Sequence, residues 1–301
     1  MVDSAYSTAR KHGGLLFLAL ASLPILATLL LDPSSYTLGW NEGRGGFLAA
    51  LILFVAEWFK AGGGYRPRYH SVIVASAVAA YFILSAAWLH KVVWVWGESL
   101  GVPLLYSWVW VWDYFVYALY LTALVLFSLG RVGLRFFSAS VTYLFGFAAI
   151  LMLDAVLPYD SVAPMQILVP VILGLNYLLL RAANVGYAAV AGNVLSLKTS
   201  EGYFTLVVYW PSAGVHSLVI YSLVMLAFLL KVDVNHKVSL FALGVVGTFL
   251  ANLLRIFLMA VYVSLVGLGG FEGIHSMLGE AALLVWLTVF LLFVSRRAGM
   301  H

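Results

Sequence analysis

Three polar residues in the C-terminal third of the chain have side chains suited to acyl transfer. Ser212 carries a hydroxyl, Arg255 a guanidinium and His275 an imidazole, and each belongs to a different, strongly apolar stretch. A hydroxyl needs an acid or base partner to attack a carbonyl group, and His titrates in the right range. A fixed Arg can stabilise the oxyanion that develops in a site without water. The three residue types together are suited to nucleophilic chemistry.

The positions of these residues along their apolar stretches predict that they lie at one depth in a membrane. Measured from the Lys or Arg at the far end of each stretch, Ser212, Arg255 and His275 are about 28, 27 and 31 Å away at 1.5 Å per helical residue. The hydrocarbon core of a bilayer is about 30 Å thick. Three separate helices therefore bring the hydroxyl, the guanidinium and the imidazole to the outer edge of the hydrocarbon.

Gly214, His216 and Asn252 are candidate supporting residues. Gly214 follows Ser212 by two positions and would let a substrate backbone approach, because glycine has no Cβ. His216 shares the helical face of Ser212 and is a rival base, although we favour a structural role for it. Asn252 precedes Arg255 by one helical turn and could orient the guanidinium.

Each of the three main residues also has a purely structural interpretation. Ser212 could cap the N-terminus of its helix, as Ser often does. Arg255 could extend to the membrane interface or neutralise Glu280, and His275 could form a polar cap on the last helix. Without further motifs, the structural interpretation of Ser212 would be the stronger one.

The composition places these residues in an integral membrane protein. Of the 301 residues, 64% are hydrophobic and only 9% are charged, whereas a soluble domain carries about 25% charged residues. Such a chain cannot cover a surface that faces water, which excludes a soluble enzyme, a disordered protein and a coiled coil. The absence of Cys excludes disulfides, zinc–thiolate sites and iron–sulfur clusters, and no metal or other cofactor is expected. The net charge of +4 is too small to indicate nucleic-acid binding.

Apolar stretches of about 18 or more residues predict transmembrane helices, because this length spans the hydrocarbon. Seven meet this condition: 14–31, 71–89, 104–130, 139–158, 213–230, 238–266 and 276–295. The shorter stretch 46–59 is predicted as an eighth. The first stretch is predicted to be retained, because no polar region with a small-residue cleavage site follows it as in a signal peptide. The expected fold is an all-α polytopic membrane protein with a single domain, 1–301.

A ninth apolar stretch, 164–180, is assigned by charge. With eight crossings, most Lys and Arg residues and both termini lie inside, as the positive-inside rule expects. A full crossing by 164–180 would move Lys231 and Lys237 outside. We therefore predict that this stretch is a re-entrant or interfacial helix, and the polar Asn176 suits a helix that does not cross. The next segment, 184–210, is predicted to be extended, with a hairpin as one form, on the outer face.

At the polar residues the chain resembles the exosortase/archaeosortase family of membrane transpeptidases. The family pattern is a Cys followed by a small residue and Gly, then Asn-x-x-Arg in a helix, then a His that opens the last helix. Pro211-Ser212-Ala213-Gly214-Val215, Asn252-Leu253-Leu254-Arg255-Ile256 and His275 match these parts in order. The resemblance covers 158–280, and the N-terminal half adds only a compatible topology.

The resemblance implies an enzyme that recognises a C-terminal sorting signal, which comprises a short motif, a transmembrane helix and a basic tail. Such enzymes cut surface proteins near the motif on the outer face of the cell membrane. They then pass the acyl group to a second nucleophile, thought to be a lipid in archaea. By this analogy position 212 carries the nucleophile, His275 is the acid or base, and Arg255 stabilises the oxyanion. The implied partners are surface proteins and a membrane lipid, and no nucleic acid is expected.

Ser212 departs from the family pattern, which has Cys at this position. A Cys thiol has an ordinary pKa of about 8.5 and gives a thiolate readily beside Arg and His, whereas a Ser hydroxyl must lose its proton as it attacks. We favour an inactivating Cys-to-Ser change made to trap the enzyme, because one substitution would then explain a chain without any Cys. A natural serine enzyme and a natural inactive homologue are the alternatives.

Two other classes of protein are alternatives to a transpeptidase. An intramembrane serine protease would show Gly-x-Ser-Gly, whereas this chain has Pro211-Ser212-Ala213-Gly214 and an Arg at the same depth. A non-enzymatic membrane transporter would be expected to show an inverted repeat or broken helices in both halves. We find no such repeat, and the polar residues gather in one half of the chain.

The N-terminal half contains two acidic residues in or beside predicted membrane helices. Either Glu57 or Asp113 could pair with Lys60 or Lys91, because an unpaired charge inside a membrane is costly. Six Trp residues between positions 88 and 112 are expected to form an aromatic belt at the outer interface. These features are interpreted as structural.

Overall fold

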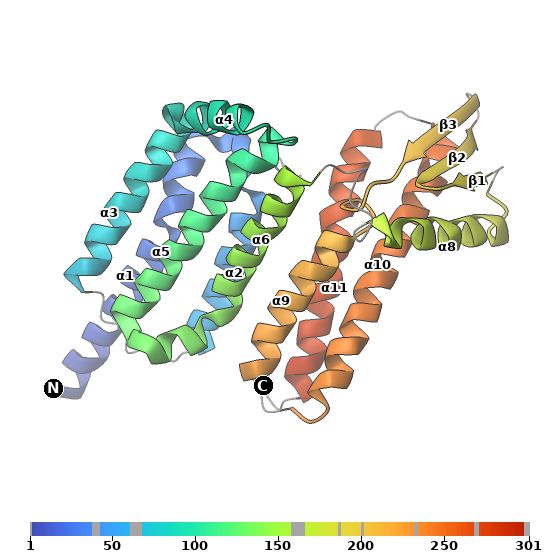
Figure 1. The fold of residues 1–301 in the computed structure, drawn as a ribbon. Helices are drawn as coiled ribbons and strands as arrows, with labels where there is room; N and C mark the ends of the chain where they lie inside the picture. Colours follow the sequence, from blue (N-terminus) through green and yellow to red (C-terminus); the bar gives the residue numbers. More distant parts are fainter. Residues whose placement is uncertain are drawn as a thin grey trace. The chain divides into compact units, whose positions relative to one another are not determined.

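The structure, a computed structural model, describes residues 2–37, 43–60, 68–157, 166–185, 188–199, 202–231, 234–267 and 271–297. These residues are mostly helical, with one small sheet in the C-terminal half (Figure 1). Contacts divide the chain into two compact units, Met1–Val156 with Leu223–Val232, and Leu157–Ser222 with Asp233–His301. The single domain expected for 1–301 stays a prediction.

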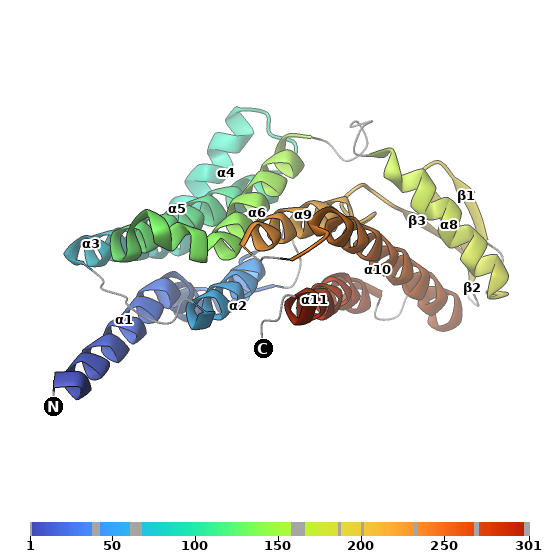
Figure 2. The ribbon, with the colours of Figure 1, turned by 90° about the horizontal axis from the view of Figure 1, so that it is seen from below.

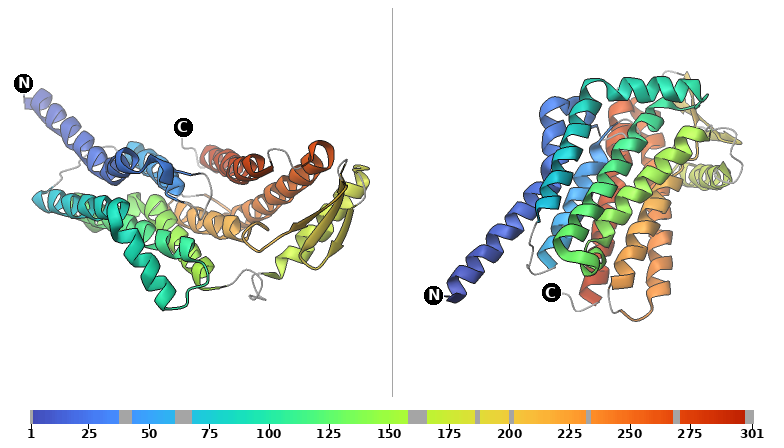
Figure 3. Two further views of the ribbon diagram at one scale, coloured as in Figure 1. Left: turned by 90° about the horizontal axis from the view of Figure 1, so that it is seen from above. Right: turned by 60° about the vertical axis from the view of Figure 1, so that its left-hand side comes forward.

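The first unit is a bundle of apolar helices. It contains α1 (Val2–Leu31), α2 (Gly45–Lys60), α3 (Tyr69–Leu84), α4 (His90–Ser99), α5 (Leu105–Phe136) and α6 (Ser138–Val156), with the short turns η1 (Pro33–Ser35) and η2 (Ser85–Leu89). Helices α5 and α6 are close neighbours (Figure 3). At η2, a π-helical turn, α3 passes into α4, which lies across the end of the bundle (Figures 1 and 3).

Aromatic side chains form much of the core of this bundle. Phe17, Phe54 and Phe137 are fully buried, and their ring centroids lie 4.6 to 5.5 Å apart. Aromatic pairs at such separations contribute about 0.5–1.5 kcal/mol beyond the area that they bury. Ring contacts therefore help to hold Phe17 of α1 and Phe54 of α2 against Phe137, the residue between α5 and α6.

Glu57 of α2 is placed at the N-terminus of α6. Its carboxylate accepts hydrogen bonds from two backbone N–H groups in the first turn of that helix, at 2.8 and 3.0 Å. A carboxylate at this position satisfies free N–H groups and complements the helix dipole. Glu57 therefore caps α6, and among the described residues it forms no ion pair with Lys91. The side chain of Lys60, the other expected partner, lies outside the described residues.

Asp113 of α5 is the centre of a buried polar cluster. Its carboxylate accepts hydrogen bonds from Arg44 Nε at 2.7 Å, the Tyr81 hydroxyl at 3.0 Å and His90 Nε2 at 3.2 Å. Both Arg44 and Asp113 are fully buried. The expected pairing of Asp113 with a Lys residue is therefore wrong, and the partner that sequence analysis overlooked is Arg44, directly before α2.

The second unit combines helices with a three-stranded antiparallel sheet. Its elements are α8 (Leu168–Ala182), β1 (Ala188–Ala191), β2 (Val194–Thr199), β3 (Gly202–Val207), the start of α9 (Val215–Lys231), α10 (Lys237–Val266) and α11 (Phe271–Arg297). Strand β2 is central: Ser196 pairs with Ala189 on one side and with Thr205 on the other. The predicted extended segment 184–210 is confirmed, but it contains two hairpins that share a strand.

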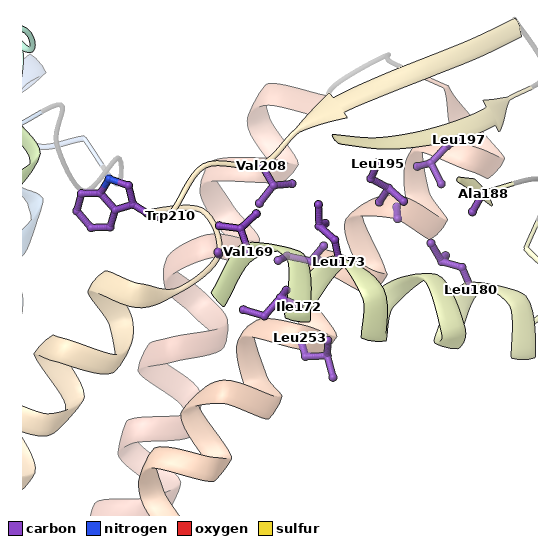
Figure 4. Packing of buried hydrophobic residues seen from close by; sticks show 13 residues of the cluster. Val169, Ile172, Leu173, Leu180, Ala188, Leu195, Leu197, Val208, Trp210 and Leu253 are labelled. Carbon is purple, nitrogen blue, oxygen red and sulfur yellow. The ribbon is translucent and has the colours of Figure 1, made fainter. Parts of the chain in front are cut away.

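Apolar side chains from α8, the sheet and α10 form the core of the second unit (Figure 4). Helix α8 lies beside the sheet and crosses α10 instead of running along it (Figures 1 and 2). Asn176 lies on the buried face of α8, and its amide nitrogen donates to the carbonyl of Ile172 at 3.0 Å. The polar side chain of Asn176 therefore points inward, and it does not mark a side of α8 that faces water.

Among the described residues, five helices are long and apolar enough to cross a membrane. They are Gly13–Leu31, Tyr69–Ser99, Leu105–Phe136, Ser138–Val156 and Lys237–Val266. The other predicted crossings, 46–59, 213–230 and 276–295, coincide with α2, α9 and α11, whose described apolar parts are shorter. The chain is therefore a helical protein embedded in a membrane, and the count of eight crossings stays a prediction. Helix α8 has 15 residues, about 22 Å at 1.5 Å per residue, which is less than the hydrocarbon thickness.

Candidate functional site

Ser212 lies in a turn between β3 and α9. Two backbone hydrogen bonds of 2.9 and 3.0 Å close this turn. Trp210 and Ala213, on either side of Ser212, are 0% and 1% exposed and belong to the core of the second unit (Figure 4). Because α9 begins only at Val215, Ser212 is not the helix cap considered from the sequence. The turn is thus anchored by its neighbours and presents Ser212 between them.

Two polar side chains of α10 bind successive carbonyl groups of this turn. Arg255 Nη2 donates to the backbone oxygen of Ser212 at 3.0 Å. Asn252 Nδ2 donates to the backbone oxygen of Ala213 at 2.5 Å. Residues three apart lie on one face of a helix, so both side chains of α10 can donate hydrogen bonds to the turn at the same time. Asn252 therefore positions the turn directly. We expected it to orient Arg255, but the hydrogen bond that the structure describes for its side chain goes to Ala213.

Gly214 allows this close approach of α10. Its φ is +87°, and a Cβ at this position would lie 2.6 Å from Asn252 Nδ2. Only glycine meets both conditions without strain, because a side chain would be unfavourable at this φ and would also collide with the amide. The space that we expected to admit a substrate backbone is occupied by Asn252.

We expect Gly214→Ala to destabilise the protein more than Gly192→Ala. Both glycines have positive φ, +87° and +61°, so each substitution costs about 1–2 kcal/mol for the left-handed backbone. Only the new Cβ at position 214 would meet another side chain, because nothing lies within 4 Å of a Cβ at position 192. Thermal unfolding of the purified protein in detergent measures the difference. Equal losses for the two variants would show that Asn252 moves aside without cost.

The guanidinium of Arg255 is buried and only partly paired. The residue is 6% exposed, and its Nε has no hydrogen-bond partner among the residues that the structure describes. Among the described residues, no carboxylate forms an ion pair with it; the side chain of Glu280 lies outside the described residues. Arg255 thus points into the protein toward the turn, and its extension to the membrane interface and its pairing with Glu280 stay predictions. An unpaired donor on a buried cation is costly, and it suits a site where a bound group supplies the acceptor.

The two candidate bases both lie near the N-terminal ends of helices. His216 is in α9 and His275 is in α11. Helix α11 packs along α10, where Trp286 Nε1 donates to Thr248 Oγ1 at 3.1 Å. The side chains of both His residues lie outside the described residues, so the choice between them stays a prediction. The Ser212 hydroxyl makes no hydrogen bond with the described side chains or backbone.

The structure gives an anchoring role to Ala213 within the motif and to Trp210 before it, which the motif alone did not indicate. Trp210 and Ala213 anchor the turn, and the only sequence signal for this role is a Trp directly before the motif.

Comparison of the chain with family models, curated proteins and solved structures finds no match. Within the described part of the chain, no group of three or more metal-binding side chains is found. The assignment of a family therefore depends on the motifs and on the geometry around Ser212.

Proposed function

We propose that the chain is a membrane-embedded transpeptidase of the exosortase/archaeosortase type, with Ser in place of the Cys nucleophile. It would cleave surface proteins at their C-terminal sorting signals on the outer face. It would then transfer the cleaved surface protein to an acceptor, for which we favour a lipid. The observation that supports this function is the buried Arg255. Its guanidinium contacts the main chain of Ser212, and no described residue accepts a hydrogen bond from its Nε, which could therefore bind another acceptor.

The proposed reaction assigns one step to each polar group. The side chain at position 212 attacks the carbonyl carbon of the scissile peptide, and His275 takes its proton. Arg255 binds the oxyanion of the tetrahedral intermediate. The C–N bond then breaks, and His275 returns the proton to the leaving amine. The acceptor's nucleophilic atom attacks the acyl-enzyme in the same manner, which releases the side chain at position 212.

The proposal includes a topology with eight crossings and both termini in the cytoplasm. Helix α8 then lies at the outer interface, which agrees with its length and with its crossing of α10 (Figure 1). The sheet and the turn with Ser212 would lie on the same outer side. This placement would give the site access to surface proteins after their translocation.

Labelling of single Cys residues should show this topology, and the absence of native Cys makes the experiment clean. A Cys in place of Lys198, in β2, is expected to react with a membrane-impermeant maleimide in intact cells. A Cys in place of Asn235, between α9 and α10, should react only after permeabilisation. The reverse pattern would place the site on the cytoplasmic side and would contradict the proposed function.

Co-expression with a reporter that ends in a motif, an apolar helix and a basic tail tests the function itself. The intact mass of the reporter separates three products: the uncut protein, the hydrolysed protein and the protein with an added acceptor. We expect the acceptor adduct from the Ser212→Cys variant, and no product when Arg255→Ala is added. Hydrolysis by the unaltered chain would instead favour an intramembrane serine protease. No product from any variant, with every variant folded, would contradict the proposal.

A further inference from the structure

Strand β3 forms one edge of the three-stranded sheet. The strand order is β1-β2-β3, so β3 pairs with β2 on one side only (Figure 1). The edge at the other end of the sheet, β1, lies beside α8 (Figure 1). The sequence of β3 is Gly-Tyr-Phe-Thr-Leu-Val, which contains none of the charged residues or prolines that commonly protect an edge strand. An edge of this composition is suited to pair with a further strand.

The pairing of β3 identifies the main-chain groups that face this edge. The N–H of Val208, directly after β3, donates to the carbonyl of Asn193 beside β2 at 2.8 Å. Successive residues of a strand direct their main-chain groups to opposite sides, so those of Thr205 and Val207 point away from β2. No described group forms a hydrogen bond with the main chain of either residue. The edge therefore offers two N–H donors and two C=O acceptors.

The same edge leads to the candidate catalytic residue. Strand β3 ends at Val207, and Ser212 follows five positions later in the turn that binds Arg255 and Asn252. The strand and this turn belong to the same compact unit. Thr205 and Val207 are exposed. A polypeptide that pairs with β3 and continues past its end would therefore pass toward Ser212.

We propose that the edge of β3 binds, as an added strand, the segment of a surface protein that precedes the scissile bond. This inference rests on the proposed transpeptidase function. In strand addition the main-chain hydrogen bonds supply affinity, and side chains at alternate positions supply selectivity. The bound segment runs parallel to β3, because it must reach Ser212 at the end where β3 does. The apolar helix of the sorting signal follows the scissile bond.

Disulfide trapping tests this pairing without any need for turnover, because the chain has no native Cys. Val207→Cys is combined with the sorting-signal reporter, which carries one Cys at successive positions before its apolar helix. Neighbouring strands lie about 4.8 Å apart, within the Cα–Cα range of about 4.4–6.8 Å that a disulfide spans. We expect disulfides at every second reporter position, because the side chains of a strand alternate between its two faces.

The matched control is Ala191→Cys, at the other edge of the sheet. Ala191 and Val207 are both exposed, and both lie opposite Val194, so they end the same row of residues across the sheet. We expect the control to trap no reporter. Equal trapping at the two edges, or trapping at consecutive reporter positions, would overturn the proposal. A disulfide-linked dimer of the Val207→Cys chain in place of a reporter adduct would overturn it too, because a second copy would then occupy the edge.

A proline tests the contribution of the main chain. Thr205→Pro removes one N–H from the edge and leaves the pairing with β2 intact, and edge strands accept Pro at such positions. We expect the affinity of the detergent-purified full chain for the reporter to fall about fivefold, the effect of one main-chain hydrogen bond. Thr205→Ala keeps the N–H and should keep the affinity. Equal affinities of these two variants, with both shown to be folded by thermal unfolding, would contradict strand addition.

These binding measurements distinguish a failure of this inference from a failure of the proposed function. Alternating disulfides with a reporter that no variant processes would support the strand edge and contradict the transpeptidase. Processing of the reporter by the Ser212→Cys variant, without alternating disulfides at position 207, would support the transpeptidase and overturn the strand edge.

Discussion

The Ser212→Cys variant is expected to process a sorting-signal reporter at least about a hundredfold faster than the unaltered chain. This factor is the lower end of what one general acid–base group contributes to a rate. A thiolate beside Arg255 forms at small cost near neutral pH, because the ordinary pKa of a Cys thiol is about 8.5. A Ser hydroxyl must instead lose its proton during the attack. The rate of appearance of the acceptor-bearing reporter, followed by intact mass, gives the ratio.

Three further substitutions in the Ser212→Cys background identify the groups that assist the thiol. Arg255→Lys is expected to lose nearly all activity, because Lys keeps the charge but lacks the planar fork that can hold an oxyanion and the carbonyl of residue 212 together. His275→Ala should abolish formation of the acyl-enzyme. His216→Ala should leave most of the activity and serves as the matched control.

Two results would change this account in different ways. If the unaltered chain already processes the reporter at the rate of the Ser212→Cys variant, the chain is a natural serine enzyme and no inactivating change is present. If activity is lost with His216→Ala and retained with His275→Ala, the base has been assigned to the wrong helix. The second result would leave the role of Arg255 intact, because Arg255 contacts residue 212 independently of either His.

The positions of the helices were predictable because a membrane leaves few alternatives. Backbone polar groups in hydrocarbon must bond within their own segment, so a long apolar stretch forms a helix. The stretch 238–266, for example, is α10 almost residue for residue. The sheet was less predictable, since β1 is Ala-Ala-Val-Ala and its composition does not indicate a strand. That strand is formed by pairing with β2 and not by local preference.

The candidate site was predictable only as far as local spacing determines it. Asn252 and Arg255 had to share a helical face, and the structure shows that they do. The carbonyl groups that they bind could not be derived, because these depend on how α10 lies against a turn 39 and 43 residues away in the chain. Arg44 was overlooked for the same reason, since its partner Asp113 is 69 residues away.

Asp113→Leu is expected to lower the free energy of unfolding by about 3–5 kcal/mol, the cost of removing one partner from a buried ion pair. The substitution would leave Arg44 fully buried beside an apolar side chain. It would also remove the acceptor of the Tyr81 hydroxyl and of His90. Unfolding of the detergent-solubilised protein by added denaturing detergent measures the loss. Glu98→Gln, at an exposed carboxylate of the same unit, should cost less than about 1 kcal/mol and is the control.

The double variant Arg44→Met with Asp113→Leu distinguishes the effect of leaving a buried charge unpaired from the effect of changing the shape of the side chains. Two apolar side chains of similar volume leave no charge in the bundle, and such replacements of buried pairs are often neutral or stabilising. The double variant would still lose the contact of Arg44 with Asp32 at 3.0 Å and its hydrogen bond to the Ser35 hydroxyl at 2.7 Å. We therefore expect the double variant to be more stable than Asp113→Leu alone but less stable than the unaltered chain. A double variant as unstable as the sum of its two single variants would show that shape, and not charge, holds these helices together.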